Sequence, residues 1–292
     1  MDFDVIVVGM GIMGSSACYS LSRRGVKVLG LEQFTLGHAL GSSHGNTRLI
    51  RKAYFEDERY VPLAKKSYQM WDMIGRHCKT PLLHRAGLLL AGEEKKGVLQ
   101  GALASAKKHR IETELLDWEA MKRRYPQFDL PQNFVGLYEP GAGYLEVERS
   151  VEEIARLAKE NGVEIHERER VEKWSATSRS VTVETNLATY KARRLVIAAG
   201  PWASQVLGKF GQKLEVWRIP QFWLKAPESF DESEKFPCYG LDLPNGFFYG
   251  VPRKGKRLLK IAQYHPPVKV VADPYKVDRE IYPSDYDEVS LS

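Results

Sequence analysis

The sequence opens on DVIVVGMGIMG at residues 4–14, an apolar run that leads directly into a G-x-G-x-x-G turn. Residues 15–24 then predict a helix, and Gly25 stands where a helix C-cap is expected. Residues 26–32 predict the next strand. Strand, turn, helix and strand in this order predict a Rossmann-type dinucleotide-binding unit.

Each glycine of the turn has its own physical reason. Gly9 permits the tight turn, Gly11 lets a pyrophosphate approach the backbone, and Gly14 lets helix and strand pack closely. The helix N-terminus offers unpaired N–H groups and the positive end of its dipole to phosphates. Glu32 follows at about the spacing where an acid accepts hydrogen bonds from ribose hydroxyls. The unit predicts dinucleotide binding but does not by itself separate FAD from NAD.

Composition places the chain among ordinary globular proteins. Of its 292 residues, 43% are hydrophobic and 27% charged, and the length is enough for two domains. No run approaches the roughly 20 apolar residues that span a bilayer, and the start lacks a signal peptide pattern, so we expect a cytoplasmic protein without a membrane partner. Cys18, Cys78 and Cys238 are odd in number and widely spaced, which predicts neither a disulfide framework nor a metal site.

The formal net charge of +6 and the pI of about 9.0 raise the question of a nucleic-acid partner. The basic residues are scattered between acidic ones instead of forming one dense tract, so we interpret them as solvated faces and expect no nucleic acid. A phosphate-rich cofactor and an acidic substrate would use only a few of them. The clusters are residues 23–24, 107–110, 122–124, 193–194 and 254–260.

The rest of the chain alternates between helical and strand-like patterns. Helices are predicted over residues 47–53, 60–78, 95–110, 118–124 and 148–161. Asp117 is the predicted N-cap of the helix over residues 118–124. Strand-like patterns cover residues 82–91, with a bend at Gly87, and residues 134–144, where a loop follows the strand. A strand is predicted at 163–166, and an antiparallel meander at 171–174, 180–185 and 189–191. Strand-like patterns also cover residues 193–202 and 217–265. Residues 266–292 show no strong periodicity.

Further segments carry a resemblance to a known family. They are GSSHGNTRLIR at 41–51, YVPLA at 60–64, AAGPW at 198–202, LK at 259–260 and YH at 264–265. With the opening unit they resemble, in order and over almost the whole chain, the FAD-dependent amine oxidases of the monomeric sarcosine oxidase and N-methyltryptophan oxidase group. The resemblance implies FAD-dependent oxidation of a secondary or tertiary N-methyl amino acid to an imine, with oxygen reduced to hydrogen peroxide.

The resemblance also implies a fold and domain boundaries. It implies a glutathione-reductase-like, Rossmann-type α/β FAD-binding domain over residues 1–80 and 145–215. A β-sheet-rich α+β substrate domain would take residues 81–144 and 216–270. Residues 271–292 would form an irregular tail.

The family pattern assigns cofactor contacts to particular positions of this sequence. His44 would lie beside the flavin and Arg48 against its ring, although a lone loop histidine with a satisfied hydrogen bond is the ordinary alternative. Val171 and Gly200 match backbone sites that touch the cofactor, and plain strand packing would explain them nearly as well. The full set implied is Gly9, Gly11, Gly14, Glu32, Ser43, His44, Arg48, Val171 and Gly200.

The substrate side of the implied site rests on fewer residues. Arg51 would hold the substrate carboxylate, and on the predicted helix it would share a face with Arg48. Lys260, in an apolar strand, would help oxygen accept electrons, the alternative being a lysine that snorkels from an edge strand. Tyr249 and His265 match substrate-pocket positions, but one extra residue between Lys260 and His265 implies a bulge or a side-chain flip.

The chain also departs from the family pattern at its C-terminal end. Relatives continue further, into a segment that carries a flavin-linked cysteine, a glycine-rich stretch and a substrate-binding lysine. Cys18, Cys78 and Cys238 do not fall at that cysteine's position. We therefore expect either a shortened, inactive oxidase whose half-site binds FAD poorly or not at all, or an oxidase whose missing parts come from another chain or copy. Apolar surface left open by the missing segment should favour self-association. An NAD-dependent dehydrogenase and a non-catalytic dinucleotide-binding protein remain alternatives.

Overall fold

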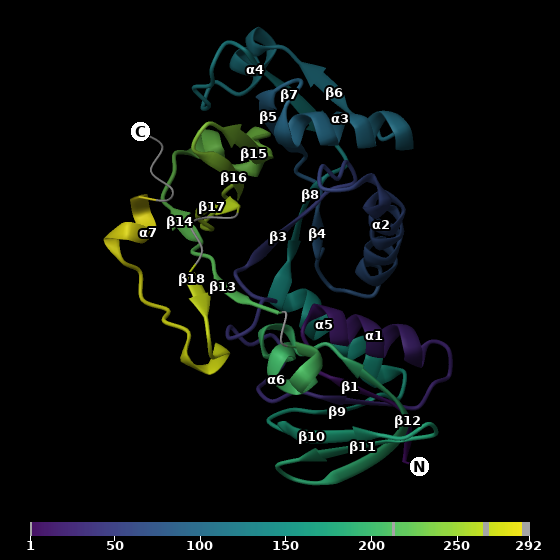
Figure 1. Ribbon diagram of the computed structural model, residues 1–292. Helices are drawn as coiled ribbons and strands as arrows, with labels where there is room; N and C mark the ends of the chain where they lie inside the picture. The colour runs from purple at the N-terminus through teal and green to yellow at the C-terminus, as the bar shows by residue number, and fades with distance from the viewer. Residues whose placement is uncertain (1, 212–213, 265–268, 288–292) are drawn as a thin grey trace. The chain divides into compact units, whose positions relative to one another are not determined.

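The computed structural model describes residues 2–211, 214–264 and 269–287, and the chain divides into two compact, discontinuous units (Figure 1). The first comprises Met1–Asn46, Glu146–Val216 and Val270–Val277, and the second comprises Thr47–Leu145, Trp217–Lys269 and Asp278–Ser292. Residues 47–80, which the sequence groups with the FAD-binding part, fall in the second unit because they pair and pack with its strands.

The first unit is built on a six-stranded sheet in the order β10-β11-β12-β1-β2-β9. β1 (Phe3–Val8), β2 (Val28–Leu31), β9 (Glu164–His166) and β12 (Thr189–Ile197) run parallel, and β10 (Val171–Ala176) and β11 (Val181–Thr185) continue β12 as an antiparallel meander. Helices α1 (Ile12–Ser22) and α5 (Val147–Glu160) lie side by side on this unit (Figure 1). The parallel order, with the first strand central, confirms the Rossmann-type prediction.

β12 joins two strands that the sequence predicts separately. Its first half pairs with β11 and its second half pairs with β1, so one long strand serves both the meander and the parallel sheet. Behind the sheet, apolar side chains of β1, β2, β11 and β12 form a buried cluster that includes Ile6, Leu29 and Val183. Because β1 is buried along nearly its whole length, it has the continuous apolar run typical of a central parallel strand.

The second unit holds a seven-stranded and a three-stranded sheet. The larger follows the order β14 (Phe222–Leu224), β17 (Leu259–Tyr264), β16 (Gly246–Val251), β15 (Cys238–Leu243), β5 (Leu88–Glu93), β7 (Phe134–Glu139) and β6 (Glu114–Leu116). The smaller follows the order β3 (Thr47–Ile50), β8 (Gly143–Glu146) and β4 (Leu83–His84). Its helices include α2 (Val61–Gly75), α3 (Gly97–His109) and α4 (Trp118–Arg124), so the β-rich α+β prediction is confirmed.

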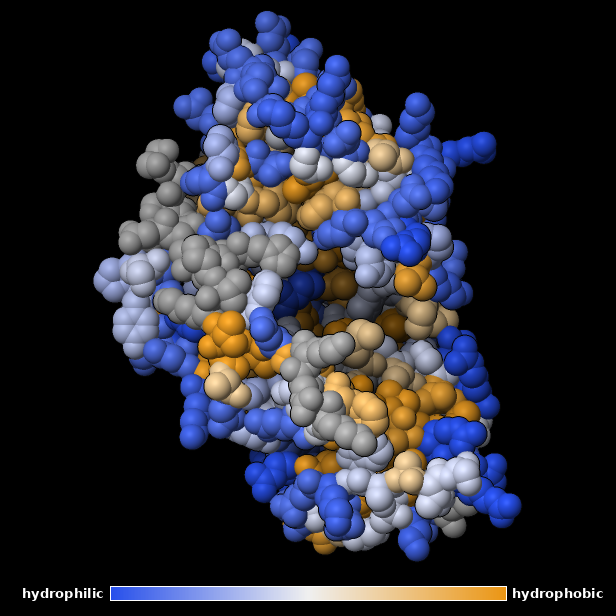
Figure 2. Space-filling model, in the orientation of Figure 1, coloured by the Kyte–Doolittle hydropathy of each residue, from blue (hydrophilic) through white to orange (hydrophobic). Residues whose placement is uncertain are grey.

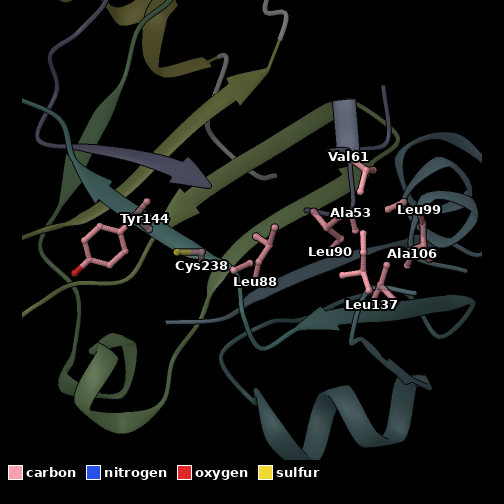
Figure 3. Packing of buried hydrophobic residues seen from close by; sticks show 13 residues of the cluster. Ala53, Val61, Leu88, Leu90, Leu99, Ala106, Leu137, Tyr144 and Cys238 are labelled. Atoms are coloured by element: carbon pink, nitrogen blue, oxygen red, sulfur yellow. The ribbon is translucent and has the colours of Figure 1, made fainter. Parts of the chain in front are cut away.

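One of two buried clusters of the second unit lies between β5, β7 and α3. Figure 3 shows the side chains of Leu90, Leu99 and Leu137 turned toward one another, with Tyr144 and Cys238 farther along the same cluster. Tyr144 is fully buried, and its hydroxyl donates to Glu232 Oε2 at 2.6 Å, which satisfies the polar end of this large side chain.

The remaining elements are short. They are β13 (Val216–Arg218), β18 (Lys269–Val271), α6 (Ala203–Leu207), α7 (Pro283–Asp287), and 3₁₀ turns at Glu58–Tyr60, Gly200–Trp202, Gly208–Gly211, Glu228–Phe230, Glu232–Glu234 and Pro274–Lys276.

One local prediction is wrong, and one cap is confirmed. Residues 47–50 form strand β3 instead of a helix, because β-branched Thr47 and Ile50 extend beside β8. Residues 272–282 hold a single 3₁₀ turn and otherwise no regular structure, and the described chain ends in the five-residue helix α7, whose buried Asp285 accepts from Arg218 Nη1 at 2.8 Å. Asp117 does cap α4, because its Oδ1 accepts from Ala120 N at 2.8 Å.

The basic clusters on α3 and α4 are solvated. Lys107, Lys108, Arg123 and Arg124 are exposed in the last turns of these helices, where positive charge complements the helix dipole. Figure 2 shows a mostly hydrophilic surface over this part of the second unit. Across the described ranges, every helix is too short or too polar to cross a bilayer.

Candidate functional site

The predicted glycine turn is strained in a way that only glycine tolerates. Gly9 has φ +90°, and a Cβ there would lie 2.5 Å from Ala198 O, on the loop after β12. A Cβ on Gly14 would collide with Gly9 O, so Gly14 allows α1 to pack directly on the turn. These contacts bring the ends of β1 and β12 together around the start of α1.

The N-terminus of α1 is open to an anion. Gly11, its N-cap residue, supplies no side chain, and the first turn contains no acidic residue. Ser43 Oγ accepts from Ile12 N at 3.0 Å, which places the predicted Ser43 directly against this helix end. Backbone N–H groups, a hydroxyl and the positive end of the dipole therefore converge here, as a phosphate requires.

A cavity of about 1200 Å³ lies in the first unit beside this turn. It is lined by six of the predicted cofactor residues: Gly9, Gly11, Glu32, Ser43, Val171 and Gly200. Gly14 lies beneath the turn, and His44 is half-buried in the following loop without lining the cavity. The cavity exceeds the range of about 300–1,000 Å³ typical of sites for drug-sized ligands, in keeping with a longer dinucleotide.

Glu32 lines the cavity and is the acidic residue expected to bind the ribose of a dinucleotide. Its side chain is buried, Oε2 accepts from Met10 N at 2.8 Å, and Oε1 accepts from Phe34 N at 3.0 Å. His38 Nε2 lies 3.6 Å from Oε1. The carboxylate is thus fixed by one backbone N–H of the glycine turn and by one of the loop that follows β2.

Sequence reasoning missed several residues that line this cavity. Trp202 and Tyr275 form an aromatic pair with centroids 5.6 Å apart, and Trp202 also packs on Phe34. Glu169 is buried and accepts from Thr185 Oγ1 at 2.6 Å. Trp202 follows a strand that ends in glycine, and this pattern could have indicated a residue at the cofactor site. No local sequence pattern marks Tyr275 or Glu169 as residues of that site.

In the second unit, Arg51 already binds a carboxylate. Its Nη2 donates to both oxygens of Glu56, each at 2.7 Å, and its guanidinium lies 4.5 Å from the centre of the Tyr54 ring and 4.6 Å from that of Phe55. Arg51 Nε is buried and has no hydrogen-bond partner among the described residues. Arg51 is therefore a cation held against two aromatic rings, and its Nε–H can still donate a hydrogen bond.

Arg48 and Tyr249 lie close enough to interact electrostatically. Burial raises the pKa of Tyr249, while the Arg48 charge and a hydrogen bond with Gln221 oppose the shift. The Tyr249 hydroxyl consequently stays protonated at neutral pH. Because β3 is a strand, Arg48 and Arg51 do not share a helix face, and Arg51 follows the strand in a loop.

Lys260 is buried on β17, with 2% of its surface exposed. Its Nζ donates to Thr47 O at 2.9 Å and lies 5.5 Å from the centre of the Trp223 ring. β17 is paired on both sides, with β14 and β16, so Lys260 is not a lysine that snorkels from an edge strand. His265 lies outside the described residues.

The residues present fit a dinucleotide cofactor. Gly9 and Gly14 leave no room for a Cβ, and the N-terminus of α1 has no acidic residue in its first turn. The buried acid Glu32 lies where a residue that binds the ribose is expected. Gly9, Gly11, Ser43 and Glu32 would hold the pyrophosphate and ribose, and Val171 and Gly200 would contact the cofactor from the strand ends.

Comparison with known proteins gives the family. Monomeric sarcosine oxidase of Bacillus sp. (strain B-0618) is 33% identical over 289 residues, covering 97% of this chain and 74% of that protein. N-methyl-L-tryptophan oxidase of Salmonella dublin is 32% identical over 266 residues, covering 91% of this chain and 71% of that protein.

Solved structures share the fold. The open form of NikD, an amino acid oxidase of nikkomycin biosynthesis, has a TM-score of 0.80 at 23% identity, covering 98% of this chain and 75% of that one. L-proline dehydrogenase from P. horikoshii has a TM-score of 0.80 at 20% identity, covering 99% and 75%. A family model described as FAD dependent oxidoreductase matches residues 4–289. The chain therefore belongs to the FAD dependent oxidoreductase family, whose cofactor is FAD.

Proposed function

We propose that this protein oxidises a secondary or tertiary N-methyl amino acid, of the sarcosine type, to an imine while reducing oxygen to hydrogen peroxide. In this proposal the first unit binds FAD and the second unit binds the substrate carboxylate. The names of the two sequence relatives, a sarcosine oxidase and an N-methyl-L-tryptophan oxidase, support this substrate class.

The observation that carries the proposal is the guanidinium of Arg51. It holds a carboxylate from its own chain, that of Glu56, and stacking on Tyr54 and Phe55 fixes the plane of its donors. An amino acid carboxylate has the same chemistry and would compete with Glu56 for these donors. Arg51 would thereby orient the substrate by its carboxylate.

The other residues of the second unit would act around the bound substrate. FAD, when bound, supplies the two-electron oxidation of the carbon next to the amine nitrogen. Lys260 would stabilise negative charge that develops on oxygen, since its ammonium is buried and held by a backbone carbonyl. Tyr249 would remain a neutral hydrogen-bond donor toward the substrate, because burial keeps its pKa high.

The absorbance spectrum and peroxide release of the purified protein test the function. A yellow protein that releases peroxide with sarcosine or N-methyl-L-tryptophan, and not with glycine or tryptophan, would support the proposal. A yellow protein inert with every N-methyl amino acid would favour the non-catalytic alternative. A colourless protein that binds NAD would contradict FAD as the cofactor.

Replacing Arg51 tests the substrate role directly. Arg51→Gln should lower kcat/KM for any carboxylate substrate by roughly 10- to 150-fold, the effect of losing a charged hydrogen bond of about 1.5–3 kcal/mol. Most of the change should appear in KM, measured by peroxide release. Arg59→Gln is the matched control, because Arg59 is 87% exposed and pairs only locally with Asp57. Equal kinetics for the Arg51 and Arg59 variants would remove Arg51 from the substrate site.

A further inference from the structure

His38 lies next to the acid that would bind the ribose of the cofactor. Its Nε2 is 3.6 Å from Glu32 Oε1, at ion-pair distance, and both side chains line the cavity of the first unit.

The hydrogen bonds of His38 determine which ring nitrogen carries the proton. Nδ1 accepts from Leu40 N at 3.0 Å, so the neutral ring has its proton on Nε2. That is the nitrogen nearest Glu32 Oε1. A neutral His38 therefore directs an N–H, and not a lone pair, toward the carboxylate.

Packing holds the imidazole in this place. Its ring lies 4.8 Å from that of Phe34 and 6.4 Å from that of Trp202, and a Cβ on Gly41 would lie 3.2 Å from His38 Cε1. Phe34 itself donates its backbone N–H to Glu32 Oε1, so the same residue supports both partners. The ring is confined between a loop glycine and two aromatic side chains.

We propose that His38 is a positioning residue for the cofactor's ribose. With Met10 N on one oxygen and Phe34 N and His38 on the other, the carboxylate of Glu32 is held in one orientation. Its remaining lone pairs then face the cavity, where ribose hydroxyls are hydrogen-bond donors. This inference rests on the proposed cofactor site.

The chemistry of the ligand gives a specific readout. FAD contains the adenosine ribose, whereas FMN lacks the adenosine half. Loss of His38 should therefore weaken binding of FAD and leave the weaker binding of FMN unchanged. A general loosening of the fold would weaken both.

The experiment is a titration of apoprotein with FAD and with FMN, followed by flavin fluorescence, for wild type, His38→Leu, His38→Gln and Glu32→Gln. His38→Leu should raise the Kd for FAD about tenfold, and His38→Gln, which keeps a donor near the Nε2 position, should raise it less than about threefold. In Glu32→Gln the additional His38→Leu change should have little further effect, because the two residues act as a unit. His77→Leu, at an exposed site of the second unit, is the matched control.

Each outcome decides one claim. Unchanged FAD affinity in His38→Leu, with weaker binding in Glu32→Gln, would overturn the role of His38 alone. Failure of wild-type apoprotein to bind FAD would overturn the cofactor site and this inference with it. An equal loss for FAD and FMN, or no rescue by His38→Gln, would assign His38 a merely structural role; thermal unfolding of each variant checks that the fold is retained.

Discussion

At the scale of single residues, the candidate site depends on charges that the fold removes from water. Lys260 is almost completely buried, and burying an ammonium is costly unless hydrogen bonds or partners offset the loss of hydration. Thr47 O and the face of Trp223 provide that compensation. A cation held at this cost on an interior strand is a candidate for function.

Replacing Lys260 should separate two half-reactions. Lys260→Met keeps the length of the side chain but removes the charge, so reoxidation by oxygen should slow by at least about tenfold, within the range of removing one electrostatic stabiliser. Reduction by substrate should change much less. Stopped-flow absorbance measures both, and Lys256→Met, an exposed lysine near β17, is the control. Equal slowing of both half-reactions would reject the role in oxygen reduction.

At the scale of elements, Glu139 holds the segment that follows β3 and carries Arg51. This carboxylate at the end of β7 accepts from Lys52 N at 3.0 Å and from Ala53 N at 3.0 Å, and it is 3% exposed. The backbone next to Arg51 therefore depends on a residue far away in the sequence. Burial raises the pKa of Glu139, and the two backbone N–H groups oppose that shift.

Substitution of Glu139 should have a pH-dependent cost. Because its folded pKa is raised, Glu139 contributes most to stability below its unfolded pKa of about 4.3, and this contribution declines as pH rises through the folded pKa. Glu139→Gln resembles the protonated acid, so it should change the free energy of unfolding by less than about 1 kcal/mol near pH 4. Relative to wild type the variant should gain stability toward pH 7, where the wild-type protein carries the cost of a buried carboxylate. Urea unfolding at both pH values measures this. Exposed Glu112→Gln should have little effect, and a cost that grows with pH would contradict the assignment.

At the scale of the whole molecule, each unit buries a cysteine in its own core. Burial raises the pKa of Cys18 in the first unit to about 12, and burial likewise raises the pKa of Cys238 in the second. Cys78 follows α2 and is half-buried. Thiols therefore report on the integrity of the two units separately. The expected self-association through apolar surface stays a prediction.

Thiol labelling should distinguish these environments. In native protein an aromatic disulfide reagent should modify Cys78 first, because thiolate character and access control the rate. Cys18 and Cys238 should react only as their units open, in two phases if the units unfold separately. Cys78→Ser should abolish the fast phase. Rapid modification of all three thiols in native protein would contradict the burial of both cores.

Sequence reasoning was most successful where a local rule is strict. The glycine turn, the Asp117 cap and the parallel order around β1 follow from backbone geometry and periodicity, which neighbouring residues carry by themselves. It failed at residues 47–50, where pairing with β8 overrides the helical pattern. It also missed Tyr275, whose place beside Trp202 depends on a return of the chain to the first unit.

The sequence by itself determined the dinucleotide-binding turn, because strain at Gly9 and crowding at Gly14 leave one residue type at each position. The sequence by itself also gave the resemblance to a known family, because each motif that carries the resemblance is a short run of neighbouring residues. Only the tertiary structure decided that Arg51 is stacked and paired with Glu56, that Lys260 lies on an interior strand, and that His38 Nε2 lies 3.6 Å from Glu32 Oε1. Burial, tautomer and partner are set by chain segments that meet only after folding, and no local pattern encodes them.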